Sequence, residues 1–230
     1  DDYLASKLRL FQNQTADDLA ILNTTLYPKL HKTLKSQVWQ FAREHEVPLG
    51  TFVREGWVMA RTKEKGEMRV MPVAEIQLPG PYNLENALAA TAVALACGAD
   101  LSGIREVLST FTGVEHRLEF VREHHGVRYY NDSKATNAQA AITALTSFTE
   151  PIIWICGGLD RGTSFTELVP YIQERVKMVI AYGEAAPILE ARAREAHVPS
   201  LRVVEIEEAV QKAAQMAKPG EIVLLSPACA

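Results

Sequence analysis

Residues 129–137 read Tyr-Tyr-Asn-Asp-Ser-Lys-Ala-Thr-Asn, and they place many polar groups between a strand-like run and a helix-like run. The first N–H groups of a helix and its dipole attract negative charge, so a polar segment at a strand-to-helix turn suits anion binding. A simpler interpretation is a helix start that Asp132 or Ser133 caps, with Lys134 in solvent. Local sequence leaves both interpretations open.

Apolar strand-like runs alternate with helix-like runs in the second half of the chain, which predicts an α/β fold with a mainly parallel, Rossmann-like sheet covered on both faces. In such sheets ligands collect beyond the carboxyl ends of the strands. Arg161 can bind a carboxylate with two parallel hydrogen bonds, which suits a small anionic substrate. The residues expected at this edge are Asp132, Ser133, Lys134, Thr136, Gly157, Gly158, Asp160, Arg161, Gly183 and Ser226.

The first half has a different pattern, with short alternating runs over residues 38–76 that predict a small antiparallel β layer. An alanine-rich helix is expected over residues 84–97, with Asn83 as its N-cap and Asn86 on the same face. Lys7 lies in an amphipathic helical segment, where a solvated lysine is the ordinary expectation. A boundary at residues 112–114 divides the chain into domains 1–114 and 115–230.

Composition describes an ordinary globular protein of 230 residues, with 47% hydrophobic and 23% charged residues. The net charge of −4 argues against a nucleic-acid partner. Three widely spaced cysteines (Cys97, Cys156 and Cys229) are expected to be buried thiols in a reducing compartment. With no membrane-length apolar run and no signal-peptide pattern, the expectation is a cytoplasmic protein without a membrane partner. Both ends break off inside regular structure, so we expect a fragment.

Several segments together resemble the Mur ligase family. Residues 78–87 (Leu-Pro-Gly-Pro-Tyr-Asn-Leu-Glu-Asn-Ala) resemble its G-x-x-N-x-x-N segment, residues 116–119 (His-Arg-Leu-Glu) its HR-x-E linker, and residues 130–137 its NDSKATN segment. Residues 157–162 (Gly-Gly-Leu-Asp-Arg-Gly) and 225–230 (Leu-Ser-Pro-Ala-Cys-Ala) complete the set. Within the family the combination is most similar to the enzymes that add D-glutamate to UDP-N-acetylmuramoyl-L-alanine.

The resemblance implies an ATP- and Mg²⁺-dependent ligase of peptidoglycan precursor synthesis, expected to act as a monomer. ATP phosphorylates the terminal carboxylate of UDP-N-acetylmuramoyl-L-alanine, and the amine of D-glutamate attacks the acyl phosphate. Residues 1–114 would be the later part of the central ATP-binding domain, and residues 115–230 the amino-acid-binding C-terminal domain.

The resemblance also assigns roles to single residues. Lys7 matches the lysine that is carbamylated and binds magnesium, which favours a functional role for it. The other matches are Asn83 and Asn86 for adenine and ribose, Arg117 for the ATP phosphates, Asp132 for the ribose, Lys134 for the reacting phosphate, Thr136 for the amino acid, and Arg161 for the D-glutamate carboxylate, where some relatives have lysine. Ser226 is expected among the substrate-binding residues.

The sequence contains neither the family's phosphate-binding loop nor its uridine-binding domain, so residues 1–230 alone are expected to lack ligase activity. Two alternatives stay open. One is a different amide ligase of the superfamily, either another Mur ligase or an enzyme similar to folylpolyglutamate synthetase. The other is a nucleotide- or amino-acid-binding module without catalysis. An NAD-dependent oxidoreductase is disfavoured, because no dinucleotide-binding fingerprint follows a first strand.

Overall fold

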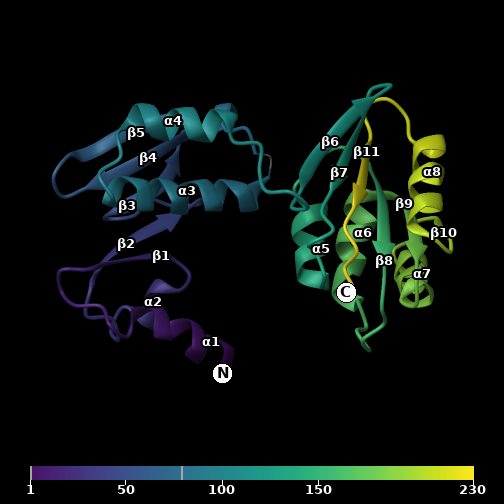
Figure 1. The fold of residues 1–230 in the computed structure, drawn as a ribbon, viewed down its shortest axis with the longest axis horizontal. Helices are drawn as coiled ribbons and strands as arrows, with labels where there is room; N and C mark the ends of the chain where they lie inside the picture. Colours follow the sequence, from purple (N-terminus) through teal and green to yellow (C-terminus); the bar gives the residue numbers. More distant parts are fainter. Residues whose placement is uncertain (1, 79) are drawn as a thin grey trace. The chain divides into compact units, whose positions relative to one another are not determined.

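A computed structural model describes residues 2–78 and 80–230 of the chain. The chain divides into two compact units, Asp1–Phe111 and Thr112–Ala230 (Figure 1). This division lies close to the expected boundary at residues 112–114. No helix among the described residues is both long and apolar enough to cross a membrane.

The first unit is built on a five-stranded sheet with strand order β1-β2-β3-β4-β5. Strands β1, β2 and β3 are parallel, whereas β3, β4 and β5 form an antiparallel meander. The expected antiparallel layer is therefore correct for β3–β5 and wrong for β2, because alternation of side chains does not specify the direction of a neighbouring strand. The strands are β1 (Leu19–Asn23), β2 (Gln37–Ala42), β3 (Gly50–Arg54), β4 (Trp57–Thr62) and β5 (Gly66–Pro72).

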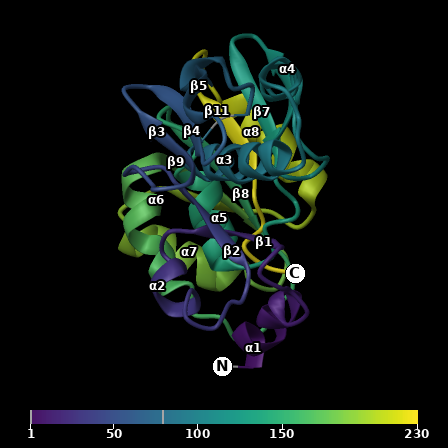
Figure 2. The same cartoon turned by 90° about the vertical axis from the view of Figure 1, so that its left-hand side faces the viewer.

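Helices α3 and α4 pack on one face of this sheet (Figure 2). Leu88 of α3 and Ile104 of α4 share an apolar cluster with Val58 and Ala60, which point to that face of β4. The expected cap was wrong: α3 begins at Pro81, with Gly80 as its N-cap, because proline fits the first turn of a helix. The helical segments are α1 (Asp2–Leu8), η1 (Arg9–Phe11), α2 (Tyr27–Leu30), η2 (Val73–Glu75), α3 (Pro81–Ala96) and α4 (Leu101–Thr110).

The second unit contains a six-stranded sheet with strand order β10-β9-β8-β11-β7-β6. All neighbouring strands are parallel except β6, which forms an antiparallel hairpin with β7. The expected Rossmann-like α/β fold with a mainly parallel sheet is confirmed. The strands are β6 (Glu119–His124), β7 (Val127–Asn131), β8 (Ile152–Gly157), β9 (Val176–Tyr182), β10 (Ser200–Arg202) and β11 (Ile222–Leu225).

Helices cover both faces of this sheet, as the apolar strands require. Alternate residues of β8 enter different cores: Trp154 packs with residues of α5, α6 and α7, whereas Ile153 and Ile155 pack with residues of α8. Figure 1 shows α8 apart from α5 and α6 across the strands. The helical segments are α5 (Ala138–Leu145), η3 (Thr166–Leu168), α6 (Val169–Arg175), α7 (Ala186–Glu195) and α8 (Ile206–Met216).

Candidate functional site

Asp132 is the buried centre of the polar segment that follows β7. Its carboxylate Oδ1 accepts a hydrogen bond from the Leu118 N–H at 3.2 Å, and Oδ2 accepts one from the Ser226 hydroxyl at 3.0 Å. Burial raises the pKa of the Asp132 carboxyl, while these two hydrogen bonds and the charge of Arg117 offset part of the rise. Asp132 therefore joins three segments that are distant in sequence.

Neither Asp132 nor Ser133 caps the following helix. Asn137 is the N-cap of α5, and its side-chain oxygen accepts a hydrogen bond from the Ala140 N–H at 2.9 Å. Because α5 begins after the polar segment, residues 132–136 form a loop between β7 and α5. The backbone of this loop is hydrogen-bonded to the segment of residues 116–119. The Lys134 N–H, for example, donates to the His116 carbonyl at 3.1 Å.

The structure thus gathers four of the expected site residues beyond the carboxyl ends of β7 and β11. Arg117 and Lys134 have exposed side chains, whereas Asp132 and Ser226 are buried. The Ser226 carbonyl also accepts a hydrogen bond from the Trp154 indole at 2.8 Å. Ser226 is thereby fixed in the interior, where its hydroxyl contacts Asp132.

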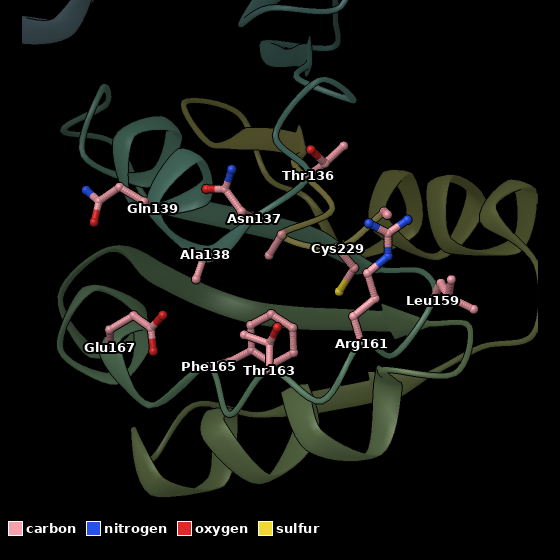
Figure 3. A pocket seen from close by; sticks show the side chains of 12 residues that line it. Thr136, Asn137, Ala138, Gln139, Leu159, Arg161, Thr163, Phe165, Glu167 and Cys229 are labelled. Carbon is pink, nitrogen blue, oxygen red and sulfur yellow. The ribbon is translucent and has the colours of Figure 1, made fainter. Parts of the chain in front are cut away.

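A cavity of about 260 Å³ opens beside this cluster, within the second unit (Figure 3). Thr136 and Arg161 line it, together with the start of α5. Arg161 is exposed and supplies positive charge, and the first turn of α5 adds the positive end of the helix dipole. The full lining is Thr136, Asn137, Ala138, Gln139, Leu159, Arg161, Thr163, Phe165, Glu167, Ala228, Cys229 and Ala230.

Two glycines at the end of β8, next to the segments that line this cavity, are in close contact with neighbouring backbone. A Cβ on Gly157 would lie 1.9 Å from the Tyr182 carbonyl oxygen, and one on Gly158 would lie 2.6 Å from the Ala230 carbonyl oxygen. Both glycines also have positive φ angles, of 131° and 143°. Gly157 therefore lets the end of β8 lie against Tyr182 of β9, and Gly158 lets residues 158–159 lie against the C-terminal segment at Ala230.

Two non-glycine residues in the lining have left-handed backbone conformations. Phe165 has a φ of 56° and Ala228 a φ of 62°, and both side chains are buried. Each such residue costs on the order of 1 kcal/mol or more, and strain of this kind concentrates at functional sites. The Ala228 N–H donates to the Ala135 carbonyl at 2.8 Å, which holds the strained C-terminal segment against the loop of residues 132–136.

A second cavity of about 240 Å³ lies within the first unit, between α3 and α4. Its lining is largely apolar, with the Asn83 and Asn86 side chains as the polar groups. Exposed Val107 and Phe111 also face it, although apolar side chains of this size are usually buried. An apolar slot with two amides fits a purine base, because an amide offers both a donor and an acceptor to the edge of adenine. The residues present therefore fit the adenine of ATP.

Lys7 lies in the last turn of α1 with an exposed side chain. Its carbamylation stays a prediction from the resemblance. Among residues 2–78 and 80–230, no group of three or more His, Cys, Asp or Glu side chains could hold a metal ion.

Sequence reasoning missed several residues of the 260 Å³ cavity, notably Cys229, Phe165 and Glu167. Cys156 and Cys229 are buried as expected, but Cys97 is exposed because it follows the last turn of α3. The position of Cys229 after the last strand was the available signal, since residues after parallel strands gather at one edge of the sheet.

The fold agrees with the comparisons to known proteins. Residues 116–229 match the model of the Mur ligase glutamate ligase domain, and residues 1–94 match that of the Mur ligase middle domain. The chain belongs to the Mur ligase family.

The curated relatives include UDP-N-acetylmuramoylalanine–D-glutamate ligases. The one from Latilactobacillus sakei subsp. sakei (strain 23K) is 44% identical over 234 residues, which cover 100% of this chain and 50% of that protein. The one from Koribacter versatilis (strain Ellin345) is 45% identical over 232 residues, with 100% and 51% coverage. This chain therefore spans about half the length of the curated relatives it matches.

Solved Mur ligases share the fold at low sequence identity. MurF from Acinetobacter baumannii gives a TM-score of 0.70 at 19% identity, covering 96% of this chain and 51% of that chain. MurF ligase from Thermotoga maritima in complex with ADP gives 0.62 at 18% identity, covering 97% and 53%. At these identities the likeness concerns the fold alone.

Proposed function

We propose that this chain is part of an ATP-dependent ligase that joins D-glutamate to UDP-N-acetylmuramoyl-L-alanine in peptidoglycan precursor synthesis. The observation that carries the proposal is the 260 Å³ cavity at the carboxyl edge of the parallel sheet, where Arg161, Thr136 and the start of α5 meet. The names of the relatives at 44% and 45% identity support the choice of D-glutamate.

In this proposal the cavity binds the incoming amino acid. Arg161 holds a carboxylate of D-glutamate, which is the task for which a planar guanidinium is best suited. The Thr136 hydroxyl and the first N–H groups of α5 offer further donors to the same ligand. Fixing both ends of the amino acid orients its amine, and such positioning supplies a large part of the rate enhancement in bimolecular reactions.

The nucleotide would use the other residues. Asn83 and Asn86 bind adenine in the apolar cavity of the first unit. Arg117 and Lys134 present positive charge to the phosphates, where fixed cations stabilise developing negative charge. ATP supplies the phosphoryl group that activates the carboxylate of UDP-N-acetylmuramoyl-L-alanine. Magnesium and the carbamate of Lys7 are part of the proposal because the sequence motifs resemble those of the Mur ligase family.

Asp132 and Ser226 would act mainly by position. Because Asp132 accepts hydrogen bonds from Leu118 and Ser226, it fixes the linker that carries Arg117 and the strand end that leads to the cavity. A direct contact of Asp132 with the ribose, and of Ser226 with the substrate, stays a prediction.

The test measures phosphate release by the complete protein that contains this chain, with ATP, UDP-N-acetylmuramoyl-L-alanine and one amino acid at a time. Release that depends on D-glutamate is expected. Release with L-lysine or D-alanyl-D-alanine, but not with D-glutamate, would reject the proposal in favour of another ligase of the family. Absence of release with all of them, from a protein that still binds ATP, would favour a binding module.

A further inference from the structure

The segment of residues 116–119 places Arg117 between two residues whose backbone is left-handed. His116 has a φ of 69° and Leu118 a φ of 45°. Residues that carry a Cβ rarely adopt this conformation, and they keep it only where surrounding contacts hold them. Arg117 itself is exposed. The backbone on its two sides, rather than packing of its own side chain, therefore sets the direction in which the guanidinium projects.

A carboxylate accepts a hydrogen bond from the backbone on each side of Arg117. On one side the Leu118 N–H donates to Asp132 Oδ1 at 3.2 Å. On the other side the His116 N–H donates to Glu119 Oε2 at 2.9 Å. Hydrogen bonds to an ionised acceptor are roughly twice as strong as neutral ones. The two carboxylates therefore hold both left-handed residues in place.

Glu119 is oriented by Asn131, its cross-strand neighbour in the β6–β7 hairpin. The Asn131 amide nitrogen donates to Glu119 Oε2 at 3.2 Å and to His116 Nδ1 at 3.0 Å. The Asn131 amide oxygen accepts a hydrogen bond from the Ser133 N–H at 3.1 Å. The Glu119 carboxylate is therefore held between the segment that carries Arg117 and the loop that follows β7.

We propose that Glu119 is a positioning residue, which holds Arg117 in a fixed place for the phosphates of ATP. This role rests on the proposed function, in which Arg117 and Lys134 bind these phosphates. Because the Lys134 N–H donates to the His116 carbonyl at 3.1 Å, the same network also fixes the backbone of the two cations relative to each other. A cation that is already in place loses less conformational freedom when the ligand binds, so affinity increases.

The experiment measures the Kd for ATP by calorimetry on the complete protein that contains this chain. Arg117→Ala should raise this Kd about tenfold or more, because it removes a charge-assisted contact. Glu119→Ala keeps the arginine but releases the segment that carries it, and it should raise the Kd about threefold to tenfold. Glu123→Ala, which removes an exposed carboxylate from the same strand, is the matched control and should leave the Kd unchanged.

The conservative variant Glu119→Gln separates the hydrogen bond from the charge. Glutamine keeps an acceptor for the His116 N–H, so Glu119→Gln should bind ATP within about twofold of wild type. Both Glu119 variants remove the same negative charge, and the difference between them therefore reports the hydrogen bond. Thermal unfolding of each variant without ATP fixes a working temperature at which all of them are folded, so that a loss of folded protein is not counted as a loss of affinity.

A double-mutant cycle separates positioning of Arg117 from a general loss of structure. If Glu119 acts through Arg117, Glu119→Ala should change the Kd of Arg117→Ala by less than about twofold. The same substitution should have its full effect in Asn86→Ala, because Asn86 belongs to the adenine cavity of the first unit. Full additivity with Arg117→Ala would overturn the role of Glu119. So would a wild-type Kd in Glu119→Ala or in Arg117→Ala, or equal losses in Glu119→Ala and Glu119→Gln.

The Kd for ATP requires no amino acid, so the test is independent of the assignment of D-glutamate. If the variants behave as expected but wild type releases phosphate only with another amino acid, Glu119 keeps its role and the proposed function fails. If release depends on D-glutamate but Glu119→Ala binds ATP as wild type does, only the role of Glu119 fails. A wild-type protein that does not bind ATP would reject both.

Discussion

Replacing Asp132 by alanine should destabilise the second unit by about 2–6 kcal/mol. The carboxylate accepts hydrogen bonds from the Leu118 N–H at 3.2 Å and the Ser226 hydroxyl at 3.0 Å, and both donors belong to buried residues. Asp132→Ala would leave both donors without a partner, and each buried unsatisfied group costs about 1–3 kcal/mol. Asp132→Asn retains an acceptor for Leu118 and should cost about 1 kcal/mol.

Thermal and urea unfolding of the purified variants measure this loss. Ser226→Ala removes one of the two donors, so its effect and that of Asp132→Ala should not add. A double-mutant cycle should give a coupling of about 0.5 kcal/mol or more, because the two side chains are in direct contact.

The pH dependence has a definite sign. Because burial raises the pKa of Asp132 in the folded state, folding favours the protonated carboxyl. The stability that wild type gains relative to Asp132→Asn should therefore be greatest below the unfolded pKa of Asp132, and it should be lost as the pH rises through the folded pKa.

The alternative is that Asp132 serves only to contact the ribose. In that case Asp132→Ala would raise the KM for ATP and leave the unfolding midpoint unchanged. A loss of stability below about 0.5 kcal/mol, which is typical of surface substitutions, would refute the positioning role.

Three further predictions concern the cavities and the glycine turn. Arg161→Ala should raise the KM for D-glutamate about 5- to 30-fold with little change in kcat, because it removes a charge-assisted contact at a partly solvated site; steady-state phosphate release checks this, and an unchanged KM would contradict it. Asn86→Ala should raise the KM for ATP about threefold to tenfold without affecting that for D-glutamate, since it removes one polar contact to the base; an equal rise for both substrates would count against an adenine cavity. Gly157→Ala should destabilise the protein by about 3 kcal/mol or more, because its Cβ would lie 1.9 Å from the Tyr182 carbonyl oxygen at a φ of 131°. Gly162→Ala, at a φ of 74° with no atom within 4 Å, is the matched control and should cost about 1 kcal/mol; equal losses in thermal unfolding would show that close approach is not the cause.

Much of the second unit follows from local sequence. The apolar run of β8 predicted a buried strand, and its alternate residues do enter cores on both faces of the sheet. The polar residues after β7 and β11 were expected at one edge of a parallel sheet, and the structure places them there. These predictions succeed because apolar patterning reports burial directly, and parallel strands place their carboxyl ends together.

Local sequence was a poorer guide to which strands pair and where helices begin. The direction of β2 and the cap of α3 were predicted wrongly, because several nearby residues can each cap a helix and each strand can pair in either direction. For α5, capping by Asp132 or Ser133 was one of two open interpretations, and the structure has Asn137 as the cap instead. In α5, Asn137 is the cap because residues 132–136 are held by Leu118, His116 and Leu225 instead of continuing into the helix.

The sequence by itself determined the α/β class, the family resemblance and four predicted site residues that line the two cavities, namely Thr136, Arg161, Asn83 and Asn86. Tertiary structure decided that Asp132 bonds to Ser226, 94 residues away, and that Cys229 shares a cavity with Arg161. Both depend on β11 lying between β7 and β8. That strand order follows from packing of the whole sheet, in which distant segments compete for the same neighbours, so no local pattern of residues specifies it.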